Sequence, residues 1–170
     1  MARAKREPLR DVLRRTYNKL DQAHFLLNHL SSAVRQDPTV LLAVESFLGG
    51  CLGATQAAFY ILDNEAPNAK MVYKAWRSSL IPSERTFLDR MMKERGDDVH
   101  GGRTTLHLNL TIQPGGTPPT STEFRFRSHS DKAEIVDACR RFIVMIDALA
   151  RTFGPRGSAA SPGNQSAEGA

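Results

Sequence analysis

The chain has 170 residues, of which 41% are hydrophobic, enough for one domain with a real core and too few for two. Lys and Arg number 23 against 18 Asp and Glu, and the formal charge of +5 at pH 7 suits partners that carry phosphate but would equally serve solubility alone. The two cysteines, Cys51 and Cys139, lie in apolar runs, so we expect them to be small core residues. This expectation argues against a disulfide framework or a thiolate metal site. Because the N-terminus lacks a signal peptide pattern and no window approaches the length of a membrane span, we expect a cytoplasmic protein with no membrane partner.

Helical periodicity dominates the chain. The first helix is amphipathic, whereas the second is apolar round most of its circumference, so we expect neighbours on several sides of it. Small residues such as Gly49 and Gly50 in the second helix favour a close crossing with another helix. Helices are expected at about residues 9–35, 39–62, 71–76, 83–94 and 130–153.

A different pattern separates the last two helices. Residues 104–112 and 122–127 alternate apolar and polar side chains on either side of a turn rich in Pro and Gly, which predicts a β-hairpin over about 103–128. Its polar face carries His107, Arg125 and Arg127, which either contact nucleic acid or face solvent.

The predicted fold is therefore mainly α, a four-helix up-and-down bundle with a β-hairpin inserted before the last helix. We expect a single helical domain at 8–154, a disordered basic N-terminus at 1–7 and a disordered, small and polar tail at 155–170. Arginines near the N-terminus, including Arg10 and Arg14, also fit a nucleic-acid binder that does not read sequence.

The strongest chemical signal is the segment Arg95-Gly-Asp-Asp-Val-His100, at the expected end of a helix. Arginine is permanently charged and binds phosphate oxygens, and histidine exchanges a proton near neutral pH, so the pair has the chemistry to cleave a phosphodiester. An Arg and a His at a helix end also serve simply to compensate the terminal carbonyls. Positions five apart diverge on an unbroken helix, and Gly96 allows the break that would bring the pair together.

In this setting the chain resembles the HEPN superfamily, four-helix proteins marked by Arg, four to six residues, then His. The resemblance covers about residues 9–153 apart from the hairpin, and rests on the long first helix, the second helix from Glu45 to Ala54, the Trp76 segment and the Arg95 to His100 spacing.

The resemblance implies a homodimer that forms a metal-independent endoribonuclease site, of toxin or phage-defence type, with no cofactor. His100 would act as general acid or base and Arg95 would stabilise the transition state. An RNA substrate and an antitoxin or other regulatory protein are the implied partners. Possible supporting residues are Glu45, Asp97 and Asp98, and possible RNA-binding residues are Arg10, Arg14, Arg103, Arg125 and Arg127.

The sequence departs from the family pattern in three ways. Gly96 follows the arginine where active members carry a polar residue, Asp97 and Asp98 place two negative charges between the pair, and Gly102 stands where some members have a modified Tyr. A catalytically silent HEPN-like dimerisation or scaffold domain is therefore the alternative. A metal site at Asp97, Asp98 and His100 is the weaker reading, since no distant cluster completes it.

Overall fold

The computed structural model describes residues 9–35, 41–101, 106–111, 121–126 and 135–153, and this part of the chain is mainly helical, as expected. None of its helices combines the length and the apolar character that crossing a bilayer would require. The helices are α1 Leu9–Val12, α2 Arg14–Arg35, α3 Leu41–Glu65, α4 Ala69–Ser79, α5 Pro82–Gly101 and α6 Ile135–Arg151, and the strands are β1 Leu106–Thr111 and β2 Ser121–Phe126.

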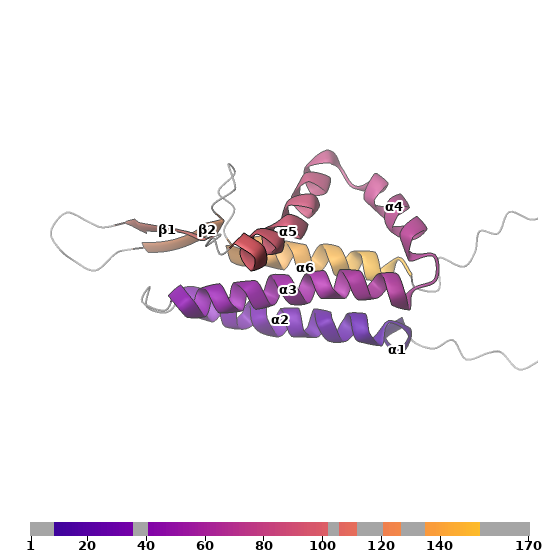
Figure 1. Ribbon diagram of the computed structural model, residues 1–170, viewed down its shortest axis with the longest axis horizontal. Coiled ribbons are helices and arrows are strands. Elements are labelled where there is room, and N and C mark those ends of the chain that lie inside the picture. The colour runs from indigo at the N-terminus through magenta and orange to yellow at the C-terminus, as the bar shows by residue number, and fades with distance from the viewer. Residues whose placement is uncertain (1–8, 36–40, 102–105, 112–120, 127–134, 154–170) are drawn as a thin grey trace, which may run out of the picture.

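Helices α2, α3 and α6 lie side by side and enclose most of the core (Figure 1). Helix α3 also contacts α4 and α5, which confirms the expectation that an all-round apolar helix has neighbours on several sides. Helices α4 and α5 meet at an angle on one side of this core, so α5 is inclined to the other three long helices (Figure 1). Pro82 begins α5, a position where its missing N–H costs nothing.

The α2–α3 contact depends on a small residue. A Cβ atom added to Gly50 would lie 3.2 Å from Cδ1 of Leu26 in α2, closer than most real contacts of that kind. The small residues of α3 therefore allow the close helix crossing that the sequence predicts.

The predicted first helix is interrupted at Leu13, which forms a turn between α1 and α2. The interruption leaves amide donors at the start of α2, and the carboxylate of Glu65 at the end of α3 accepts from the backbone N–H groups of Arg15 and Thr16, each at 2.9 Å. The Thr16 hydroxyl donates to the same carboxylate at 2.8 Å. Glu65 thus caps α2 from a distant helix, which periodicity in one helix does not predict.

Helix α6 supplies the apolar face that closes the core. Cys51 and Cys139 are fully buried thiols, as expected from their apolar surroundings. Seven apolar residues that the sequence places on one stripe of the last helix are all buried: Ile135, Val136, Cys139, Phe142, Ile143, Ile146 and Leu149.

Strands β1 and β2 pair antiparallel, with His107 opposite Arg125 and Leu108 opposite Phe124. The connecting residues 112–120 lie outside the described part of the chain, so the predicted turn remains a prediction, as do the disordered ends at 1–7 and 155–170.

Candidate functional site

The C-terminal turns of α5 carry the Arg/His segment. The expected end of this helix at Glu94 is wrong, because α5 continues through Gly96 to Gly101. A single glycine lowers helix stability by only about 1 kcal/mol relative to alanine, which does not by itself break a helix held by tertiary contacts. On a regular α-helix, positions 95 and 100 are about 140° apart round the axis and about 7.5 Å apart along it.

A buried glutamine fixes this part of α5 on the bundle. Gln56 of α3 is 3% exposed, and its Nε2 atom donates to the backbone carbonyls of Met91 at 3.1 Å and Met92 at 2.9 Å. These carbonyls belong to the turn directly before Arg95, so the amide of Gln56 sets the position from which the last turns of α5 extend. The sequence patterns did not identify Gln56 as an anchor of α5, because all that distinguishes it in the sequence is that it is a polar residue within an apolar helix.

Several predicted site residues gather at one end of the molecule. The C-terminal end of α5, the start of α6 and the β1–β2 pair, which contains Arg125, lie at this end (Figure 1). Strand β2 contacts both α2 and α6 there. Glu45 is half-buried near the start of α3, with no ion pair among the described side chains, so its pairing with Arg95 remains a prediction.

The side chains of Arg95, Asp97, Asp98 and His100 lie outside the described residues, although their backbone is helical. Arg103 and Arg127 lie outside the described part altogether. Within that part, no group of three or more His, Cys, Asp and Glu side chains is arranged to hold a metal ion.

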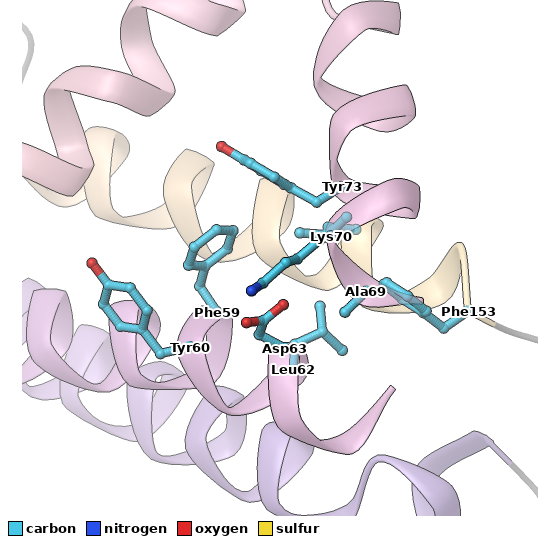
Figure 2. Close-up of a pocket in the computed structure, with 9 residues that line it drawn as sticks. Phe59, Tyr60, Leu62, Asp63, Ala69, Lys70, Tyr73 and Phe153 are labelled. Atoms are coloured by element: carbon cyan, nitrogen blue, oxygen red, sulfur yellow. The ribbon is translucent and has the colours of Figure 1, made fainter. Parts of the chain in front are cut away.

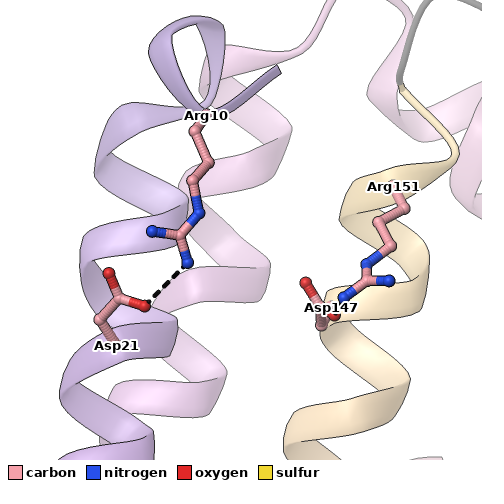
Figure 3. Close-up of polar contacts among 4 residues, drawn as sticks. All are labelled: Arg10, Asp21, Asp147 and Arg151. Carbon is pink, nitrogen blue, oxygen red and sulfur yellow. Dashed lines mark hydrogen bonds and ion pairs between the residues drawn. The ribbon is translucent and has the colours of Figure 1, made fainter. Parts of the chain in front are cut away.

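The N-terminal arginines lie at the opposite end of the bundle, near the end of α6 (Figure 1). Arg10 pairs with Asp21 at 3.2 Å and stacks over the ring of Tyr17, and Asp147 and Arg151 of α6 form a second pair nearby (Figure 3). Burial and the charge of Asp147 raise the pKa of Tyr17. The structure therefore does not bring Arg10 and the neighbouring, exposed Arg14 together with the end of α5.

A pocket that the sequence did not indicate opens between the end of α3, the start of α4 and the end of α6 (Figure 2). Its volume is about 240 Å³ and its walls include Phe59, Tyr73, Leu149 and Phe153. The ring of Phe59 meets that of Tyr73 edge to face at 5.0 Å. Residues of three helices form this pocket, so no local sequence pattern reports it.

Comparisons with known proteins add no relative: the chain matches no family model, and neither a curated protein nor a solved structure is significantly similar to it.

Proposed function

We propose that this chain is a metal-independent endoribonuclease of HEPN type that acts as a homodimer, with Arg95 and His100 as its catalytic pair. The observation that carries the proposal is the gathering of α5's last turns and the His107–Arg125 strand pair at one end of the bundle (Figure 1). Gln56 supports it, because a fixed helix end holds catalytic groups more accurately than a loop.

The chemistry follows from the two side chains. His100 takes the proton from an RNA 2′-hydroxyl as the 2′-oxygen attacks the adjacent phosphorus, and the bond from phosphorus to the 5′-oxygen breaks as that oxygen takes a proton from water. Arg95 stabilises the negative charge that develops on the phosphate oxygens. Such positioned proton transfer typically contributes about 10²–10⁴-fold to the rate.

The unbroken helix favours a site shared between two chains. Since positions 95 and 100 diverge by about 140° on a regular helix, Arg95 of one chain and His100 of the other would meet the same phosphate more easily than a pair from one helix. Arg125 is the proposed RNA-binding residue at this end. An antitoxin or other regulatory protein would act by covering the same end.

The test is cleavage of a fluorescent RNA in the presence of a chelator, with His100→Ala and Arg95→Ala. His24→Ala and Lys93→Ala are matched controls, because each removes the same kind of residue from an exposed helical position. We expect both site variants to lose cleavage by about 100-fold or more and both controls to keep it. Cleavage that survives both site substitutions, at equal helix content and dimer fraction, would refute the catalytic assignment.

The second candidate is a catalytically silent dimerisation or scaffold domain. Because α5 is continuous through Gly96, positions 95 and 100 diverge within one chain, so a dimer that does not align the segments of its two chains would be silent. Asp97 and Asp98 also oppose the approach of a phosphate. Light scattering that gives a dimer, together with no cleavage of any RNA tested, would select this alternative.

A further inference from the structure

The pocket of Figure 2 has an apolar interior and a charged opening. Leu62 and Leu149, which are 2% and 1% exposed, line it together with the half-buried rings of Phe59 and Tyr73. Apolar walls with a few polar groups at one side are typical of sites that bind small molecules.

Two opposite charges face this opening. Asp63 extends from α3 and Lys70 from α4, and Figure 2 shows the carboxylate and the ammonium reaching toward the same space. Both side chains are exposed, and no hydrogen bond or ion pair joins either of them to another residue among those described. Both charges are therefore open to a ligand.

The charges restrict the ligand. A simple anion would be attracted by Lys70 and repelled by Asp63, and a simple cation in contact with the aromatic rings would be repelled by Lys70. A neutral apolar molecule would make no use of either charge. A molecule that carries one charge of each sign, close together, satisfies both residues.

The volume restricts the ligand further. A pocket of about 240 Å³ is smaller than the roughly 300–1,000 Å³ of most small-molecule sites, so its interior suits a single apolar group. We propose that this pocket binds a free α-amino acid with an aromatic or branched apolar side chain. Lys70 holds its carboxylate, Asp63 holds its ammonium, and its side chain lies between Phe59, Leu149 and Phe153.

L-phenylalanine and L-leucine are the probes, with binding to the full chain measured by calorimetry and by saturation-transfer NMR. Phenethylamine lacks the carboxylate, N-acetylphenylalanine lacks the ammonium and glycine lacks the apolar group, so each removes one proposed contact. Lys70→Met and Asp63→Asn remove the partner charges, and both positions are exposed, so the fold tolerates the change. Lys74→Met, an exposed position of the same helix that does not line the pocket, is the matched control.

We expect one or both complete amino acids to bind, and each site variant and each incomplete analogue to bind about tenfold more weakly or worse, which corresponds to the loss of one charged contact. Lys74→Met should bind like the wild type. No binding of either amino acid at millimolar concentration would overturn the proposal. Equal binding of an incomplete analogue, or binding unchanged in both Lys70→Met and Asp63→Asn, would overturn it as well.

Discussion

Removal of the Glu65 carboxylate is the most direct test of how the two longest helices of the core are joined. Its oxygens accept two backbone hydrogen bonds at 2.9 Å and one from the Thr16 hydroxyl at 2.8 Å. Thr16 is fully buried, so in Glu65→Ala its hydroxyl and amide lose a partner that water replaces poorly. A helix cap contributes about 0.5–2 kcal/mol and a hydrogen bond to a charged group about 1.5–3 kcal/mol, so we expect a loss of about 2–3 kcal/mol in the free energy of unfolding.

Urea denaturation followed by circular dichroism measures this loss, provided that the m value is unchanged. A double-mutant cycle isolates the contact: Thr16→Val removes the hydroxyl at similar volume, and Glu65→Ala combined with Thr16→Val should cost less than the sum of the single changes by about 1 kcal/mol. Glu65→Gln keeps an acceptor oxygen and should fall between the wild type and Glu65→Ala. A loss below about 0.5 kcal/mol in Glu65→Ala, within the range of ordinary surface substitutions, would refute the capping role.

Two further predictions concern buried polar groups. Gln56→Met removes the amide at similar volume and should lower the free energy of unfolding by about 1–2 kcal/mol. Gln56→Glu should lower it further, because a carboxylate would face the two carbonyl oxygens of Met91 and Met92. Urea denaturation measures both losses, and a larger loss in Gln56→Met than in Gln56→Glu would contradict the contact. Burial, and to a lesser extent the charge of Asp147, raises the pKa of Tyr17 above 10.0. The neutral phenol of Tyr17 therefore contributes its full stabilisation of the fold below pH 10, and this contribution is lost as the pH rises from there through the folded-state pKa. Tyr17→Phe should therefore make unfolding less sensitive to pH above 10, which denaturation at several pH values would check, with Tyr73→Phe as a comparison because burial raises the pKa of Tyr73 too.

Local sequence determines much of the helical architecture. Periodic apolar residues locate the long helices and identify the buried stripe of α6, because a helix in water must bury one face whatever its partner is. The all-round apolar character of α3 likewise indicates its central place. Pro82 marks the start of α5 because proline is accepted in the first turn of a helix and not in its interior.

Tertiary structure decides what depends on residues far apart in the chain. Glu65, at the end of α3, caps the amide groups that the break at Leu13 leaves free at the start of α2. Gln56 holds the turn of α5 before Arg95, and α5 continues beyond Glu94, where local propensity predicts that this helix ends. The pocket beside Lys70 likewise exists only where three helices meet. Sequence patterns report the preference of one segment for burial, whereas a cap, an anchor or a cavity arises from the relative positions of several segments.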